Sequence, residues 1–246
     1  MIALITPTGA RPAQVQLCAK YMRRQTYTGR VCWVVVDDCV PCTTAFIDDN
    51  FRKDWEILHV HPRPAWQVGQ NTQGRNLAAG VDALLEAHAE KDIEAIYIIE
   101  DDDWYSPVYL HEMQLRLQSY HLIGETHTMY YNVQYRRYHE NLNAEWSSLF
   151  QTAFTPAVLP EFRKLYAEKF IDFVFFKHVT RNKNLFRLQP KLAVGMKGMT
   201  GRTGIGAGHR FSTNLIPDTN LSMLKFLIGD DADAYAGYWD CGHAQH

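Results

Sequence analysis

The chain has no long hydrophobic run. Hydrophobic residues make up 46% of its 246 residues, but they never form the uninterrupted stretch of about 18 that a transmembrane helix needs. The first residues, Met1-Ile2-Ala3-Leu4-Ile5-Thr6-Pro7, lack the basic start and the length of a secretory signal peptide. We therefore expect a soluble, cytoplasmic protein without a membrane span.

Cysteine is scarce, and its spacing does not suggest a disulfide framework. The five cysteines are an odd number, which fits reduced thiols in a reducing compartment. Cys39 and Cys42 have half of a zinc-finger spacing, but no second pair stands at a standard distance. The sequence also lacks repeats, low-complexity segments and a proline-rich linker, so we expect a single domain.

Charge is nearly balanced overall and unevenly distributed along the chain. The net charge is −2, yet residues 160–217 carry 11 Lys and Arg against 3 Asp and Glu. A basic segment in an otherwise acidic chain suggests an anionic ligand, either a diphosphate or a nucleic-acid backbone. A solvated basic face is the alternative explanation.

The first half of the chain alternates apolar strands with amphipathic helices. Continuous apolar runs are typical of buried parallel strands, and apolar residues at helical spacing predict the helices between them. This alternation predicts an α/β fold with a mostly parallel sheet flanked by helices. The predicted strands are 2–6, 31–36, 56–61 and 95–99, and the predicted helices are 12–25 and 74–89.

The second half follows a different pattern. We predict helices over 107–120, 156–169, 171–179 and 219–228, an aromatic strand over 128–135, and a short strand over 192–194. Residues 195–210 hold six glycines among sixteen residues, so a flexible loop without regular structure is expected there. Lys197, Arg202 and Arg210 make this loop basic. It is suited to closing over an anionic ligand such as a diphosphate.

The fourth predicted strand ends in four consecutive acids, Glu100-Asp101-Asp102-Asp103. Such closely spaced like charges at the end of a buried strand favour a hard divalent cation as neutraliser. Strand alternation would point Asp101 and Asp103 the same way and Asp102 the other, which predicts a clamp for Mg²⁺ or Mn²⁺. The alternative is a solvated acidic turn in which Asp103 caps the next helix.

A second pair of acids, Asp37-Asp38, ends the second predicted strand. Ligands of open α/β sheets bind beyond the carboxyl ends of the strands. The two acidic strand ends are therefore expected to share one crevice.

These motifs, in this order, resemble the family 2 glycosyltransferases, which have a Rossmann-like GT-A fold. The resemblance covers about residues 2–110, and the sequence departs from it at Gly9-Ala10 and at Cys39. It implies a nucleotide-sugar-binding half at 1–110 and an acceptor-binding half, or C-terminal acceptor lobe, at 111–246 with the Gly-rich basic loop 195–210. The matching residues are Ile5-Thr6-Pro7-Thr8 with Arg11-Pro12, Gln25-Thr26-Tyr27, Val34-Val35-Val36-Asp37-Asp38, Gly74-Arg75-Asn76-Leu77-Ala78, and Ile98-Ile99-Glu100-Asp101-Asp102-Asp103.

The resemblance also implies roles for individual residues. Asp101 and Asp103 are expected to hold Mn²⁺ or Mg²⁺, with His209 as a third ligand. The donor is expected to be a nucleoside diphosphate sugar, most commonly a UDP-sugar in such enzymes. The expected donor-binding residues are Thr6, Pro7, Thr8, Arg11, Asp37, Asp38, Arg75, Asn76, Asp101, Asp102, Lys197, Arg202 and Arg210.

Relatives place the general base of inverting transfer on an Asp at the start of a downstream helix. Asp172 stands at such a position, and its apolar neighbours would raise its pKa towards that of a useful base. Helix capping is the alternative role for Asp172. Glu161 and Glu168 are poorer candidates because their surroundings are typical of an exposed helix face.

The expected activity is thus metal-dependent inverting glycosyl transfer to a hydroxyl acceptor, which is a saccharide, a protein or a hydroxylated base in DNA. Two alternatives stay open, namely a sugar-phosphate nucleotidyltransferase and a non-catalytic module that binds a nucleotide sugar or nucleic acid. Tyr130, Tyr131, Tyr135 and Tyr138 are candidates for stacking on a sugar or a base. Core packing would explain these tyrosines equally well.

Overall fold

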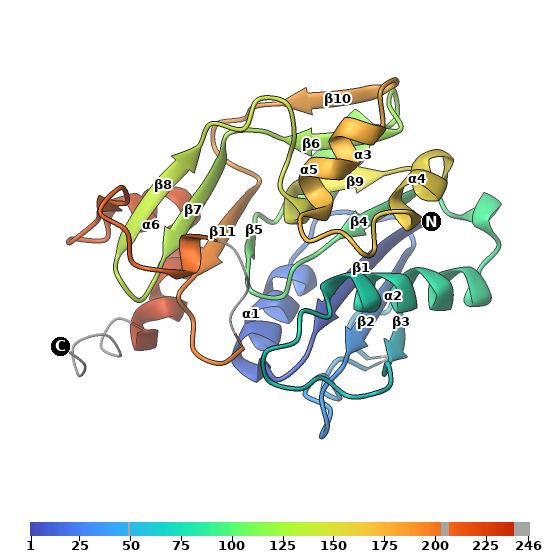
Figure 1. Cartoon of the computed structure of the whole chain (residues 1–246), viewed down its shortest axis with the longest axis horizontal. Coiled ribbons are helices and arrows are strands. Elements are labelled where there is room, and N and C mark those ends of the chain that lie inside the picture. Colours follow the sequence, from blue (N-terminus) through green and yellow to red (C-terminus); the bar gives the residue numbers. More distant parts are fainter. Residues whose placement is uncertain (49, 203–206, 239–246) are drawn as a thin grey trace.

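A computed structural model describes residues 1–48, 50–202 and 207–238, and its centre is a seven-stranded sheet (Figure 1). Parallel pairing joins β1 to β2 and β4, β2 to β3, and β6 to β10, whereas β9 runs antiparallel to β4 and β6. The predicted α/β fold with a mostly parallel sheet is confirmed. In spatial order the strands are β10 (Lys183–Phe186), β6 (Leu122–Glu125), β9 (Thr152–Phe154), β4 (Ala95–Ile98), β1 (Ile2–Thr8), β2 (Val31–Asp37) and β3 (Trp55–Val60).

Helices cover both faces of this sheet because its strands are apolar on both sides. Along β2, Trp33 and Val35 pack into one core with α1, α3 and α6, while Val34 and Val36 pack into the other core with α2, α4 and α5. The helices are α1 (Pro12–Arg23), α2 (Gln73–Ala87), α3 (Tyr109–Leu117), α4 (Leu159–Arg163), α5 (Ile171–His178) and α6 (Ser222–Ile228). No helix within the described ranges combines the length and the hydrophobicity that crossing a bilayer requires.

A second, five-stranded sheet lies beside the first (Figure 1). It corrects the prediction that residues 195–210 contain no regular element, because β11 continues through Gly195 to Lys197, where it pairs with β7. Burial and pairing with β7 override the low strand propensity of glycine. The strands are, in order, β12 (Ile216–Pro217), β8 (Arg137–Asn141), β7 (Thr128–Asn132), β11 (Ala193–Lys197) and β5 (Trp104–Tyr105).

Elements of the second half are shorter than their sequence patterns suggest. The helix predicted over 156–169 is limited to a 3-10 turn at Pro156–Val158 followed by α4. The sequence pattern missed β6, β9 and β10 because they are short and, unlike β4, are not continuous apolar runs. Their positions are set by pairing with neighbouring strands instead.

The strand register brings the sequence motifs to one edge of the central sheet. Thr8 at the end of β1 lies opposite Asp37 at the end of β2, and Ile5 lies opposite Ile98 at the end of β4. The segments that follow β1, β2 and β4 therefore begin close together. Helix α2 starts at the same edge and runs back along the sheet (Figure 1).

Candidate active site

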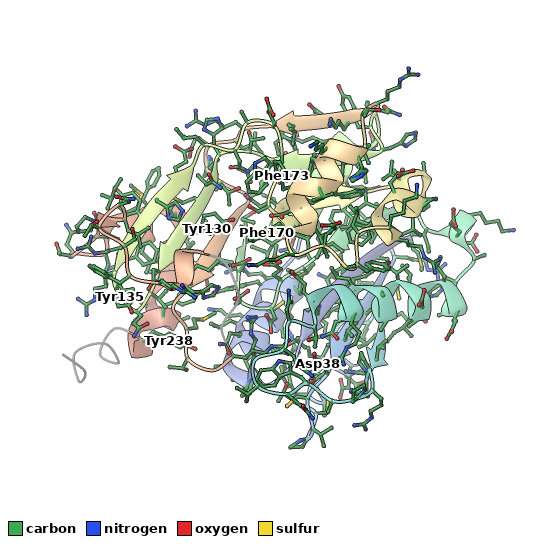
Figure 2. The ribbon with its side chains drawn as sticks, viewed as in Figure 1. Asp38, Tyr130, Tyr135, Phe170, Phe173 and Tyr238 are labelled. Carbon is green, nitrogen blue, oxygen red and sulfur yellow. The ribbon has the colours of Figure 1, made fainter. Side chains whose placement is uncertain are left out.

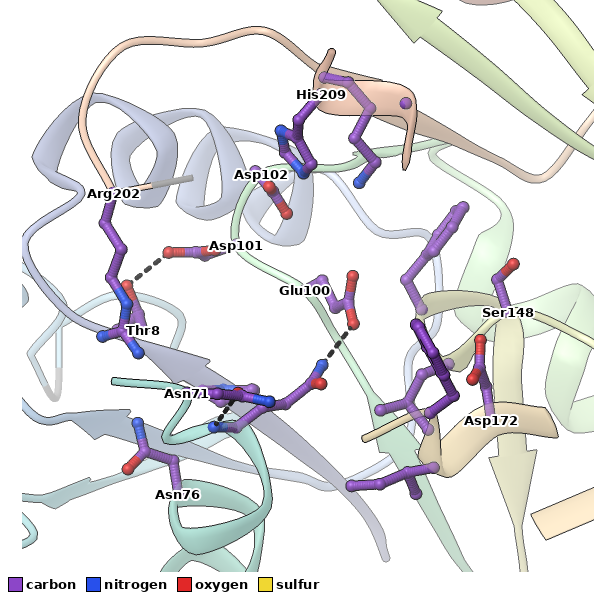
Figure 3. A pocket seen from close by; sticks show the side chains of 18 of the residues that line it. Thr8, Asn71, Asn76, Glu100, Asp101, Asp102, Ser148, Asp172, Arg202 and His209 are labelled. Atoms are coloured by element: carbon purple, nitrogen blue, oxygen red, sulfur yellow. Dashed lines mark hydrogen bonds between the residues drawn. The ribbon is translucent and has the colours of Figure 1, made fainter. Parts of the chain in front are cut away.

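A cavity of about 360 Å³ lies at this edge, and the two halves of the chain both line it (Figure 3). From the first half come the segment after β1, the start of α2 and the acidic turn after β4. The second half contributes β7 and β8, the start of α5, and the end of β11 with the segment after it. The predicted site residues among the lining residues are Pro7, Thr8, Arg11, Asn76, Asp101, Asp102, Asp172, Lys197, Arg202 and His209.

The acidic turn is arranged differently from the expected clamp. Strand β4 ends at Ile98, so residues 100–103 form a turn and strand alternation does not pair Asp101 with Asp103. Glu100, Asp101 and Asp102 line the cavity, whereas Asp103 does not. The carboxylate of Asp103 instead accepts hydrogen bonds from the Met196 backbone N–H (2.8 Å) and from Lys197 Nζ (3.2 Å).

Both carboxylate oxygens of Asp101 interact with residues near the start of the chain. It accepts a hydrogen bond of 2.5 Å from Thr8 Oγ1, and its other oxygen pairs with Arg11. Arg11 also reaches Asp102 (3.4 Å) and donates to the backbone carbonyl of Arg202 (2.8 Å). Arg11 thus holds the acidic turn and the C-terminal basic segment together.

Three carboxylates in the turn are close enough to share a cation. Oxygens of Glu100, Asp102 and Asp103 lie within 4.8 Å of one another. Burial raises the pKa of Glu100 to about 7 and also raises the pKa of Asp103. Both shifts mean that the anionic form of these neighbouring carboxylates is unfavourable unless positive charge lies close by. Burial also acts to raise the pKa of Asp102, but Arg11, Lys197 and His209 outweigh it and leave that pKa lowered.

Two buried polar atoms at this place have no hydrogen-bond partner among the described residues, namely Asp103 Oδ2 and His209 Nδ1. His209 lies near Asp102 in the cavity wall (Figure 3). Burial and the nearby Lys197 lower the pKa of His209 to about 4, so the imidazole is neutral and can offer a lone pair. Unpaired buried donors and acceptors are costly. A divalent cation held by the three carboxylates would satisfy Asp103 Oδ2, whereas His209 is not part of the group within 4.8 Å.

Asp38, expected to contact the donor, is enclosed and does not line the cavity. Its side chain is 0% exposed and accepts hydrogen bonds from Asn76 Nδ2 (2.8 Å), Arg75 Nη2 (3.1 Å), Arg202 Nη1 (2.8 Å) and Thr72 Oγ1. It therefore ties the start of α2 to the segment that carries Arg202. In this structure Asp38 positions cavity residues rather than facing the cavity itself.

We expect Asp38→Ala to lower the free energy of unfolding by about 3–5 kcal/mol, since it leaves the cationic side chains around it without their shared anion. Urea denaturation of the purified variant measures this change. Asp54→Ala is the matched control, because it breaks a surface ion pair with Arg52 and should cost at most about 1 kcal/mol. Equal losses in the two variants would contradict the assigned role of Asp38.

The other predicted donor residues occupy supporting positions. Asp37 accepts from the backbone N–H groups of Cys39 and Thr43, which shape the turn after β2 and outweigh burial to lower the pKa of Asp37. Thr6 is buried, and its hydroxyl accepts a hydrogen bond from Trp33 Nε1.

The predicted donor-binding arginines outside the cavity differ in their surroundings. Arg75 donates hydrogen bonds to Asp38 and to the backbone carbonyl of Pro64, whereas Arg210 is exposed. Residues 203–206 of the predicted loop lie outside the described residues.

Arg202, in the Gly-rich segment, contacts residues from the first half of the chain. Its guanidinium carbon lies 4.6 Å from the centre of the Trp66 ring, and it donates to Asp38 Oδ1 and Thr72 Oγ1. Arg202 also lines the cavity. It can therefore present positive charge to an anion bound there.

Asp172 lies on the opposite side of the cavity, in the first turn of α5, near Ser148 (Figure 3). It accepts a hydrogen bond of 2.9 Å from the backbone N–H of Phe173. Burial raises its pKa despite this bond. Asp172 does not cap α5, because the N-cap residue is Phe170 and no side-chain cap hydrogen bond is formed there. The raised pKa of Asp172 suits a carboxylate that takes up a proton.

The tyrosine cluster divides between cavity and core. Tyr130 lines the cavity, stacks on His139 with ring centres 5.2 Å apart, and contacts Ser148 through its hydroxyl (2.7 Å). Tyr131 is buried, so core packing explains it. Figure 2 shows Tyr130 near Phe170, and Tyr135 farther along the molecule.

Several lining residues were missed at the sequence level. Gln73 at the start of α2 donates to Glu100 Oε1 (2.9 Å), and nothing in its local sequence indicated this role. Glu100 itself was part of the acidic run, but it was not among the residues predicted to bind the donor or the metal. The further missed residues are Gln70, Asn71, His139, Asn141, Trp146, Ser148, Lys169 and Phe170.

Comparison with known proteins identifies relatives in fold alone. No protein-family model and no curated protein sequence matches the chain. Among solved structures, residues 1–349 of S. aureus TarS in complex with UDP match with a TM-score of 0.57 and 14% identity, over 79% of this chain and 60% of that one. The same TarS fragment in complex with UDP-GlcNAc matches with a TM-score of 0.56 and 15% identity, over 86% of this chain and 61% of that one.

The chain therefore spans about three fifths of the TarS fragment, and 36% of the longer TarS chain. Because identity is 14–15%, the similarity concerns the fold and not the individual site residues. The conclusion is that this chain has the GT-A-like α/β fold that S. aureus TarS also has.

Proposed function

We propose that the protein is a metal-dependent inverting glycosyltransferase that moves a sugar from a nucleoside diphosphate sugar to a hydroxyl acceptor. One observation carries the proposal. A single cavity joins an acidic turn with an incompletely satisfied carboxylate to the half-buried carboxylate of Asp172 on its opposite wall. Such a layout separates a diphosphate-binding side from a proton-accepting side.

The donor is proposed to be a uridine diphosphate sugar. Thr8, Arg11, Lys197 and Arg202 supply hydroxyl, guanidinium and ammonium groups to one side of the cavity, and such groups bind phosphate oxygens. The solved TarS structures in complex with UDP and UDP-GlcNAc support a uridine nucleotide. The basic 160–217 segment contributes Lys197 and Arg202 to this side.

The residues present fit a divalent cation of the Mn²⁺ or Mg²⁺ type. Oxygen ligands in a cluster, with an unpaired carboxylate oxygen and a neutral imidazole beside them, suit such an ion. Glu100, Asp102 and Asp103 would hold it, and His209, predicted as a third ligand, lies outside this group. Asp101, named as a ligand at the sequence level, is less available because Thr8 and Arg11 occupy its oxygens. When bound, the ion supplies Lewis-acid stabilisation to the departing diphosphate.

The second half of the cavity is proposed to bind the acceptor. Asp172 would take the proton from the acceptor hydroxyl while that oxygen attacks the anomeric carbon, and the bond from this carbon to the diphosphate oxygen breaks. The nucleoside diphosphate leaves with that oxygen, and the anomeric configuration inverts. Phe170 is 52% exposed and, with Trp146 and Tyr130, gives this side aromatic surfaces on which a sugar ring or a base can stack.

A nucleotide panel tests the donor assignment directly. We expect UDP with Mn²⁺ or Mg²⁺ to raise the unfolding temperature of the purified protein by several degrees, since ligand binding to the native state alone stabilises it. A chelator should remove most of this shift, and GDP, CDP and ADP serve as matched controls. The proposal fails if no nucleoside diphosphate gives a metal-dependent shift.

A further inference from the structure

A second group of potential metal ligands lies away from the cavity. Cys32 is the second residue of β2, Glu56 is the second residue of β3, and His88 directly follows α2. Cys32 and Glu56 are paired across the two strands. Because α2 runs back along the sheet from the cavity, this group lies at the amino ends of the strands, at the far end from the cavity (Figure 1).

The donor atoms of these three residues converge. One ligand atom from each, including the Cys32 sulfur, lies within 4.8 Å of the others, and His88 Nε2 is 3.2 Å from Glu56 Oε2. Any three points this close share a centre within about 2.8 Å, so shifts of about 0.5–0.8 Å per donor give zinc-ligand distances of 2.0–2.3 Å. Side-chain rotations supply shifts of this size.

Two of the three donor atoms lack hydrogen-bond partners in the part of the chain that the structure describes. His88 Nε2 is buried and makes no hydrogen bond within the described residues, and no hydrogen bond of the Cys32 thiol is found there either. Burial and the nearby Glu56 carboxylate raise the pKa of Cys32 to about 12. A cation would reverse both the desolvation penalty and the repulsion between the two anionic donors.

From this geometry we infer that Cys32, Glu56 and His88 form a binding site for a thiophilic divalent cation, with Zn²⁺ as the best match. A sulfur, an imidazole nitrogen and a carboxylate oxygen suit Zn²⁺ and disfavour Mg²⁺ and Ca²⁺. Glu56 is 45% exposed in its side chain and leaves a path for the ion and for a water as fourth ligand. The bound ion would fasten the amino ends of β2 and β3 to the end of α2.

The test uses the full chain with Cys39, Cys42 and Cys241 replaced by Ser, so that Cys18 and Cys32 are its only thiols. Titration with Co²⁺ after chelator treatment should produce a thiolate-to-cobalt charge-transfer band and the visible bands of a four-coordinate site. Competition with Zn²⁺ should remove them. Saturating Zn²⁺ should raise the unfolding temperature by about 5–10 °C at a concentration one hundred times the Kd.

Two variants in this background assign the site. Cys32→Ala and His88→Gln should weaken Zn²⁺ binding by roughly 100-fold or more, beyond the 10–100-fold cost of losing an outer partner of a metal ligand. Cys18→Ala is the matched control, because Cys18 is also a buried thiol but belongs to no ligand group. It should leave the band unchanged.

Absence of the charge-transfer band would overturn the inference and leave Glu56 and His88 as a simple ion pair. Unchanged Zn²⁺ affinity in His88→Gln would do the same. His88 is at the end of a helix, and its substitution leaves the apolar core intact, so a folding failure of Cys32→Ala does not remove the test.

Discussion

Asp102→Asn is expected to lower kcat/KM for sugar transfer by about 10³-fold. Asp102 lines the cavity, belongs to the carboxylate group around the unpaired Asp103 oxygen, and has a lowered pKa that keeps it anionic. Asparagine keeps the shape and removes the charge that would hold a divalent cation. Loss of the several kcal/mol that such an ion supplies corresponds to a rate loss of this size.

Steady-state transfer assays with Mn²⁺ and Mg²⁺ measure the effect, together with the metal-dependent UDP shift of the same variant. Asp82→Asn is the matched control, since Asp82 makes an exposed ion pair with Arg163 on the outer side of α2. It should retain nearly full activity. If Asp102→Asn keeps metal-dependent transfer, the cation is held by other residues, and Asp101 with Asp103 becomes the next set to test.

Asp172→Asn is expected to lower kcat for transfer by about 10²–10⁴-fold, the range typical of a removed general base. Nucleotide binding should persist, because Asp172 lies across the cavity from the residues assigned to the diphosphate. The rate falls because the asparagine side chain cannot take up a proton from the acceptor hydroxyl. It can still accept the hydrogen bond from the Phe173 N–H.

The pH profile separates this role from a purely structural one. Burial raises the pKa of Asp172, and the base is active only when deprotonated. The wild-type rate should therefore fall as pH decreases through that raised pKa, whereas the residual rate of Asp172→Asn should lack this acidic limb. Glu168→Gln, an exposed neighbour, serves as control. Transfer and donor hydrolysis that survive undiminished in Asp172→Asn would refute the assignment.

The sequence predicted the arrangement of the first half well because that half uses long, regular elements. Apolar runs and helical periodicity gave the strands and helices of residues 2–99 to within a few residues. The second half depends on strands of two to five residues, which carry almost no periodic signal. Gly195–Lys197 shows the consequence, since a glycine-containing segment becomes a buried strand only through pairing with its neighbour β7.

The acidic run at residues 100–103 shows the same limit of prediction from sequence at the candidate active site. Its four carboxylates and their position after a buried strand were evident from composition. The direction of each carboxylate was not, because it depends on β4 ending at Ile98 and on Arg11 and Thr8 arriving from another strand. The turn thus lines the cavity with Glu100 and Asp102, and Asp103 contacts Lys197.

The sequence by itself determined the α/β class and the ordered motifs of the first half. These features arise from local periodicity and residue chemistry, whereas Asp172 became the candidate base through the resemblance to the family 2 glycosyltransferases. The tertiary structure alone decided which carboxylates face the cavity, that Asp38 is enclosed by two arginines, and that Cys32, Glu56 and His88 converge. Those outcomes depend on contacts between residues far apart in the chain, and a single sequence carries no local signal for them.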